Sequence, residues 1–162
     1  MINVTKLLTG MKGEGDHLRY AITAGAKPHG VSAGKGPVVV WNVTRACNLS
    51  CRHCYADACS VKDPDEMSTA EAKEFIEDLA AFQVPVLLFS GGEPLIRKDI
   101  FELISFAASK GLRPVVSTNG TLITPNKARM LKEAGVKYVG ISLDGLGERH
   151  DTFRGKRGSF EQ

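Results

Sequence analysis

Apolar residues gather in four short runs, and longer amphipathic stretches separate these runs from one another. The first run, residues 37–43, is continuous and rich in β-branched side chains. This pattern is typical of a strand that is buried on both faces. Similar runs at residues 84–89, 113–118 and 137–143 predict three further strands.

The stretch after the first run carries a clear helix start. Ser68 is followed three residues later by Glu71, the spacing of a capping box, in which each side chain binds the backbone N–H of the other residue. Apolar residues then recur at helical spacing, which predicts one face packed on a core. That face comprises Ala72, Phe75, Ile76, Leu79 and Ala80.

Two more helices are predicted between the later runs. Residues 99–110 precede Gly111, which suits the left-handed position just after a helix. Thr124 and Pro125 form an N-cap with proline in the first helical position, and that helix should end at Gly135.

The resulting order is β-α-β-α-β-α-β. Short loops and helical crossovers predict a parallel sheet in an α/β fold. No glycine-rich dinucleotide or phosphate-binding fingerprint follows any of the strands, which disfavours a nucleotide-binding Rossmann domain. Residues 1–36 are glycine-rich and poorly patterned, so we expect an N-terminal arm there and a core domain over residues 37–162.

Composition narrows the function classes. The chain has 162 residues, 43% hydrophobic and 24% charged, as expected for one soluble globular domain. The net charge of +3 comes without a long basic run, so we expect no nucleic-acid partner. We find neither a membrane span nor a signal peptide and expect a cytoplasmic protein. In that reducing compartment the four cysteines would be metal ligands rather than disulfides.

The cysteines are concentrated in one loop. Cys47, Cys51 and Cys54 have the spacing C-x3-C-x2-C, and Cys59 follows outside this spacing. Three thiolates are one short of the four that normally hold a [4Fe–4S] cluster, which would leave one iron open for chemistry. A zinc site with His53 as fourth ligand is the alternative, although no second pair of ligands follows. Cys59 is expected to be a buried or loop thiol.

Polar residues, cysteines or glycines follow every predicted strand at its carboxyl end. Because these ends meet at one edge of a parallel sheet, where ligands bind in such folds, we expect the loops to form one site. Any one of them alone could be a simple turn. The loops are the cysteine loop and residues 90–94, 117–120 and 142–145.

These motifs, in this order, together with His150, Asp151 and Arg154, resemble the radical S-adenosylmethionine (SAM) superfamily. The resemblance implies the N-terminal part of a partial (β/α)6 TIM-like barrel. The chain ends where a further helix should begin, so we expect a fragment of about four strands, lacking later strands and an auxiliary-cluster region. His53 departs from the aromatic residue that most members carry there.

The resemblance also implies residue roles. Cys47, Cys51 and Cys54 would hold a [4Fe–4S] cluster, and SAM would chelate the fourth iron. One electron from the cluster would then split SAM to a 5′-deoxyadenosyl radical. The implied SAM-binding residues are His53 along the adenine, the backbone of Gly91, Gly92 and Glu93 at the amino group, Ser117 and Arg154 at the carboxylate, and Asn119, Ser142 and Asp144 at the ribose or nearby.

The N-terminal residues resemble radical SAM enzymes that trim tetrapyrrole side chains. This implies removal of acetate groups from didecarboxysiroheme, giving iron-coproporphyrin for haem biosynthesis, with ferredoxin or flavodoxin as electron donor. His17 or His29 could bind the tetrapyrrole iron, although a structural histidine is the more common case. Two alternatives remain open: a radical SAM maturase that modifies peptides, and a zinc-stabilised α/β binding module.

Overall fold

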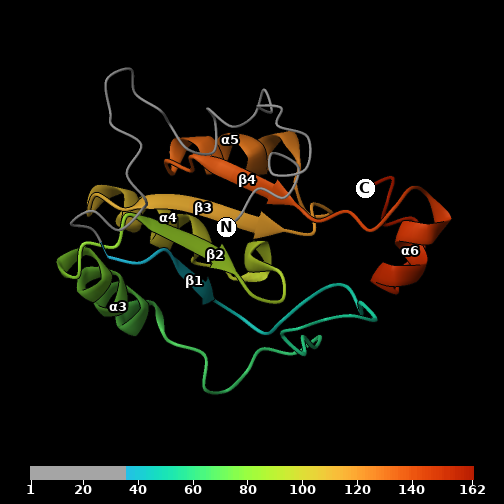
Figure 1. The fold of residues 1–162 in the computed structure, drawn as a ribbon, viewed down its shortest axis with the longest axis horizontal. Coiled ribbons are helices and arrows are strands. Elements are labelled where there is room, and N and C mark those ends of the chain that lie inside the picture. The colour runs from blue at the N-terminus through green and yellow to red at the C-terminus, as the bar shows by residue number, and fades with distance from the viewer. Residues whose placement is uncertain (1–35) are drawn as a thin grey trace, which may run out of the picture. The chain divides into compact units, whose positions relative to one another are not determined.

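The computed structural model describes residues 36–162, and the arm expected at residues 1–36 therefore lies outside the described residues except for Gly36. Strands and helices alternate along the chain (Figure 1). The elements are β1 (Val39–Asn42), α3 (Thr69–Ala81), β2 (Val86–Ser90), the 3-10 turn η1 (Pro94–Ile96), α4 (Ile100–Ser109), β3 (Arg113–Thr118), α5 (Pro125–Glu133), β4 (Tyr138–Ile141) and α6 (Glu148–Arg154).

The four strands form one parallel sheet in the order β1-β2-β3-β4, which confirms the predicted topology. Consecutive helices contact each other, α3 with α4 and α4 with α5. Figure 1 shows α4 behind β2 and β3. Because all the strand pairs are parallel, the carboxyl ends of the four strands lie at one edge of the sheet.

The core lies between this helical layer and the sheet. Its largest fully buried side chains include Leu87 and Phe89 of β2 and Ile100, Leu103 and Ile104 of α4. Complete burial of a side chain of this size contributes about 1.5–3 kcal/mol relative to leaving it in water. The helix-covered face of the sheet is thus the main source of stability.

The predicted helix ends are confirmed in atomic detail. The backbone N–H of Ser68 donates to Glu71 Oε2 at 2.8 Å, and the N–H of Glu71 donates to Ser68 Oγ at 3.3 Å. At the start of α5, Thr124 Oγ1 accepts from the N–H of Lys127 at 3.2 Å. Gly111 follows α4 with a φ of +85°, in the left-handed region that favours glycine.

The expectation that the first strand is buried on both faces is wrong. Trp41 packs on Phe75 and Phe89 on the helix side, but Val38 and Val40 are 48% and 57% exposed. β1 is an edge strand with helices on one face, and an apolar run in the sequence cannot show what covers each face. Ile141 of the opposite edge strand is 56% exposed in the same way. Among residues 36–162, no helix is both long enough and apolar enough to cross a membrane.

Candidate functional site

A cavity of about 280 Å³ lies at the carboxyl edge of the sheet, where the loops after all four strands meet. These loops follow strands that are adjacent in the sheet, so the parallel topology itself brings them together. The cavity is lined by Cys47, Leu49, Cys51, His53, Cys54, Tyr55, Ala58, Ser90, Gly91, Gly92, Ser117, Thr118, Asn119, Ser142, Leu143, Asp144 and Arg154. Every predicted site residue except Glu93 is among them.

The loop after β2 packs directly on the start of the cysteine loop. The N–H groups of Gly92 and Glu93 donate to the carbonyls of Thr44 and Ala46, both at 2.8 Å. A Cβ on Gly91 or Gly92 would come closer than 3.0 Å to the backbone oxygen of Thr44 or Ala46. Contact between two loops of the chain therefore requires glycine at both positions.

The end of α6 supports the same loop from the other side. Ser50 N–H donates to the carbonyl of Arg154 at 3.1 Å, and Arg52 N–H donates to that of Phe153 at 2.9 Å. Gly155 follows with a φ of +66°, and a Cβ there would overlap the carbonyl of Ser50. The segment with the cysteines is thus held between the β2 loop and α6.

Cys59 contributes through its backbone. Its carbonyl accepts from the N–H of Cys47 at 2.7 Å, and its N–H donates to the carbonyl of Arg45 at 3.0 Å. The thiol is exposed and lies 3.1 Å from the carbonyl oxygen of Val61. Cys59 therefore closes the loop that contains the other cysteines, a role that spacing alone could not reveal.

All four cysteines are free thiols. The pKa of the Cys47 thiol is raised, mainly by burial and further by the nearby Glu93, Cys51 and Cys54, against a hydrogen bond from the N–H of Leu49. Burial and nearby negative charge of this kind favour the neutral form of the Cys47 thiol.

No three His, Cys, Asp or Glu side chains within residues 36–162 are close enough together to hold a single metal ion. A tetrahedral zinc needs its sulfur ligands gathered within about 2.3 Å of one point. A cluster does not need this convergence, because each thiolate binds a different iron. The donor set of three thiols around one cavity fits a cluster.

The Glu93 carboxylate is buried beside the cavity and joins two of its walls. It accepts hydrogen bonds from Leu95 N–H at 3.0 Å, and from the Thr118 hydroxyl and Asn119 N–H at 2.9 Å. Burial raises the pKa of Glu93, while these hydrogen bonds lower it. The side chain is a brace between the loops after β2 and β3, and only its backbone could face a ligand.

The side chain of Asn119 belongs to a ring of polar groups beside Cys47. Its Nδ2 donates to Asn48 Oδ1 at 2.9 Å and lies 3.9 Å from Cys47 Sγ. Asn48 in turn donates to Thr121 Oγ1 at 2.8 Å, and this hydroxyl donates to Asn119 Oδ1 at 2.8 Å. Sequence reasoning missed Asn48 and Thr121, although the position of Asn48 between two cysteines was a usable signal.

A charged group lies opposite, at the loop after β4. Arg154 Nε is 2.8 Å from Asp144 Oδ2, and His53 Nε2 is 3.4 Å from the same oxygen. The Arg154 and Asp144 atoms are buried but are not aligned as a hydrogen bond. Arg154 Nη1 also lies 3.7 Å from Cys51 Sγ. This wall of the cavity therefore combines a cation with a carboxylate next to the thiols.

Tyr55 lines the cavity near the ends of β1 and β2 and was not predicted. The Tyr55 hydroxyl lies 3.0 Å from Asn42 Oδ1 and 3.2 Å from Ser90 Oγ. Tyr55 directly follows the last cysteine of the motif, which is the signal that could have identified it. Ser117 and Ser142 line the cavity as expected.

Comparison with known proteins identifies the family. The family description "Radical SAM superfamily" matches residues 41–162. The chain belongs to this superfamily. The radical SAM assignment made from the cysteine spacing and the later loops is therefore confirmed, and so is the α/β fold of a partial TIM-like barrel for the part of the chain that the structure describes.

Three curated relatives match different shares of the chain. Fe-coproporphyrin III synthase of Methanosarcina barkeri is 51% identical over 99% of this chain and 41% of its own length. Pre-heme d1 synthase of Dinoroseobacter shibae is 48% identical over 78% of this chain and 31% of its own length. The mycofactocin maturase MftC of Mycolicibacterium smegmatis is 41% identical over 76% of this chain and 31% of its own length. The chain thus spans less than half the length of these relatives.

A solved radical SAM structure shows the same fold. Native anSMEcpe with bound AdoMet, which is SAM, superimposes with a TM-score of 0.59 and 28% sequence identity. The match covers 73% of this chain and 35% of that chain. That structure contains bound AdoMet and shares the fold over the matched part of this chain.

Proposed function

We propose that Cys47, Cys51 and Cys54 hold a [4Fe–4S] cluster and that SAM completes it, for radical removal of acetate side chains from an iron tetrapyrrole. One observation carries the proposal: three free thiols line one side of a cavity whose other walls come from the loops after the three remaining strands. When bound, the reduced cluster supplies the electron that cleaves SAM, and the chain's own residues position the two groups.

The geometry refines which groups would bind SAM. The amides of Gly92 and Glu93 already donate to the cysteine loop, so Gly91 and Gly92 offer carbonyl oxygens, which suit a SAM ammonium group. Arg154 would meet the SAM carboxylate, because a planar guanidinium can bind a carboxylate with two parallel hydrogen bonds. Ser117 also lines the cavity, at the end of β3, and can add a hydroxyl donor.

The remaining predicted residues would position the nucleoside part. His53 lines the cavity and packs edge-on against Phe153, with ring centroids 5.8 Å apart, and this contact supports a role for its ring alongside the adenine. Ser142 and Asp144 offer acceptors for ribose hydroxyl groups. The Asn119 side chain is already committed to Asn48, so any ribose contact would have to share it.

The proposal of a tetrapyrrole substrate rests on similarity to the relatives. The match to Fe-coproporphyrin III synthase extends over nearly the whole chain, including the N-terminal residues, whereas the match to the maturase covers 76% of it. We therefore place didecarboxysiroheme, or an iron tetrapyrrole like it, ahead of a peptide. A ferredoxin or flavodoxin in the cytoplasm would supply the electron. The maturase match keeps peptide modification as the second candidate.

Anaerobic reconstitution with iron and sulfide, followed by incubation with SAM and a reductant, tests the proposal. We expect a brown protein with about four irons per chain that forms methionine and 5′-deoxyadenosine. A colourless protein that holds one zinc would contradict it. The substrate is tested by adding didecarboxysiroheme or a precursor peptide to parallel samples. Binding of the tetrapyrrole, followed by its visible spectrum, supports the first candidate, and binding of the peptide alone supports the second.

A further inference from the structure

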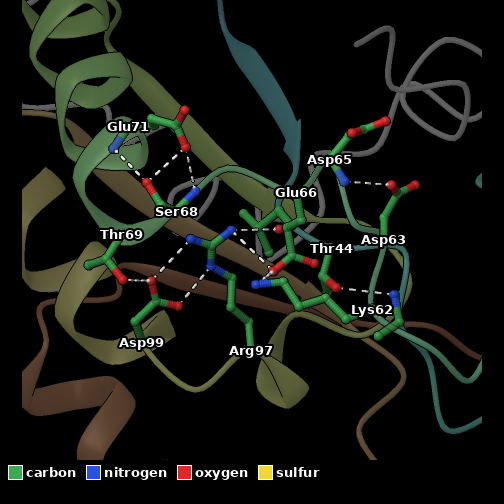
Figure 2. Close-up of polar contacts among 12 residues, drawn as sticks. Thr44, Lys62, Asp63, Asp65, Glu66, Ser68, Thr69, Glu71, Arg97 and Asp99 are labelled. Atoms are coloured by element: carbon green, nitrogen blue, oxygen red, sulfur yellow. Dashed lines mark hydrogen bonds and ion pairs between the residues drawn. The ribbon is translucent and has the colours of Figure 1, made fainter.

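Arg97 is a buried cation outside the cavity that none of the proposed roles uses. Its side chain is only 4% exposed, which is unusual for arginine. It follows η1, at the far end of the loop that begins with Gly91 and Gly92. Figure 2 shows it at the centre of a set of polar contacts from several segments.

The guanidinium of Arg97 contacts three different parts of the chain. Nε and Nη2 form a two-point ion pair with Asp99, at 2.7 Å to Oδ1 and 3.0 Å to Oδ2. Nη1 donates to the carbonyl of Val43 at 2.9 Å and lies 3.5 Å from Glu66 Oε1. The Trp41 ring packs against the guanidinium carbon at 5.8 Å. The fixed fork of an arginine is what allows one side chain to make these contacts together.

Two of these contacts mark the ends of the cysteine loop. Val43 directly precedes the loop, and Glu66 follows it, so residues 44–65 contain all four cysteines. One guanidinium therefore holds both the entry and the exit of the segment that supplies the thiols. Asp99 fixes the guanidinium and is itself bound by the Thr69 hydroxyl at 2.7 Å, at the start of α3.

The buried charges make this contact set costly to break. The Glu66 side chain is 5% exposed, and its Oε2 is buried without a hydrogen-bond partner in the described part of the chain. Lys62 Nζ lies 3.4 Å from Oε1 of the same carboxylate. Removing Arg97 would leave a buried carboxylate with only the exposed Lys62 to balance its charge, so the exit of the loop would move toward water.

We propose that Arg97 is a positioning residue for the cluster, acting through Val43 and Glu66 to set the spacing of the three thiols. That the thiols bind a cluster rests on the proposed function. The clamp, meaning the contacts of Arg97 with Val43 and Glu66, is present in the chain without any iron. It differs from a simple core contact because its loss should release the cysteine loop and leave the helix-covered core folded.

Amide hydrogen exchange of the iron-free chain tests the clamp directly. In Arg97→Gln we expect exchange about tenfold faster at amides of the cysteine loop, including those of Cys47 and Cys59, and at the Glu93 amide that donates to this loop, with little change in α4 and β3. Arg97→Lys keeps the charge but has a single donor head, so an intermediate effect is expected. Ile104→Val is the matched control, because it weakens the core without touching the loop and should leave these amides unchanged.

Reconstitution of the same variants gives the second readout. We expect Arg97→Gln to bind at most half the iron of the unchanged chain and to show an altered electron paramagnetic resonance spectrum, while Ile104→Val binds a full complement. If Arg97→Gln fails to fold, Glu66→Gln takes its place in the test. This variant keeps the shape of the side chain and should also accelerate exchange in the cysteine loop. Loop exchange and iron content equal to those of Ile104→Val would overturn the inference. Failure of the proposed function would appear in the unchanged chain, as an absence of cluster and SAM cleavage.

Discussion

The helix-covered face of the sheet and its carboxyl edge are held together by different kinds of interaction. The face is built from apolar side chains such as Leu87, Phe89 and Leu103, which are completely buried. The edge is built from backbone contacts that only glycine permits, as at Gly92, and from buried charges such as Arg97. Stability therefore lies mainly in one region and cofactor geometry in the other, so substitutions should separate the two.

The largest separation is expected from the cysteines. Serine in place of Cys47, Cys51 or Cys54 should abolish SAM cleavage, because each would supply one iron ligand in the proposed cluster, and should leave the melting temperature of the iron-free chain nearly unchanged. Cys59→Ser is the matched control, since Cys59 acts through its backbone and should retain cluster and cleavage. Iron content and methionine release measure the effect. Equal loss in all four variants would show that the ligand set is drawn wrongly.

The opposite pattern is expected from the core. Leu103→Ala removes a completely buried side chain of α4 and should lower the free energy of unfolding by about 2–5 kcal/mol. Denaturant unfolding measures this loss. At a temperature where the variant remains folded, its iron content should match that of the unchanged chain. A folded Leu103→Ala variant that loses its cluster would contradict the separation of the two regions.

Glycine substitutions should act at the edge with a smaller energetic cost. In Gly92→Ala the new Cβ would overlap the backbone of Arg45 and Ala46, so we expect a loss of about 1–3 kcal/mol and a shifted cysteine loop. Gly111→Ala is the control, because nothing lies within 4 Å of its Cβ position and only its positive φ is strained. Iron binding should fall in Gly92→Ala and persist in Gly111→Ala. The same iron content in both variants would argue against the contact.

The smallest effect concerns acid stability. Burial raises the pKa of Asp99, but hydrogen bonds from Arg97 and Thr69 outweigh it and hold this pKa below its ordinary value. Such a carboxylate stabilises the folded chain above its unfolded pKa, and this contribution is lost as the pH falls through the folded value. Asp99→Asn should therefore flatten the fall of the melting temperature below about pH 4. An unchanged slope would show that the pair does not contribute.

The four strands, helices α3 to α5 and the edge that holds the candidate site could be predicted from the sequence because their signals are local, whereas η1 and α6 were not predicted. Ser68, Gly111 and Thr124 mark helix ends through hydrogen bonds or dihedral angles within a few residues. The loops after the strands could be assigned to one edge because parallel topology requires it.

The supporting interactions could not be predicted because they join residues far apart in the chain. The contact of Arg97 with Val43 and that of Glu93 with Thr118 depend on packing that no local pattern encodes. The same limit explains the error at β1. The apolar run predicted a strand correctly but could not show that Val40 would be 57% exposed, on the face opposite to that of Trp41.

The most direct test of the central claim is whether SAM binds to the cluster held by the cysteine loop. Electron paramagnetic resonance of the reduced, reconstituted chain should change on addition of SAM, and the change should be absent in a sample reconstituted from Cys51→Ser. An iron-loaded chain whose electron paramagnetic resonance spectrum does not change when SAM is added would contradict the account.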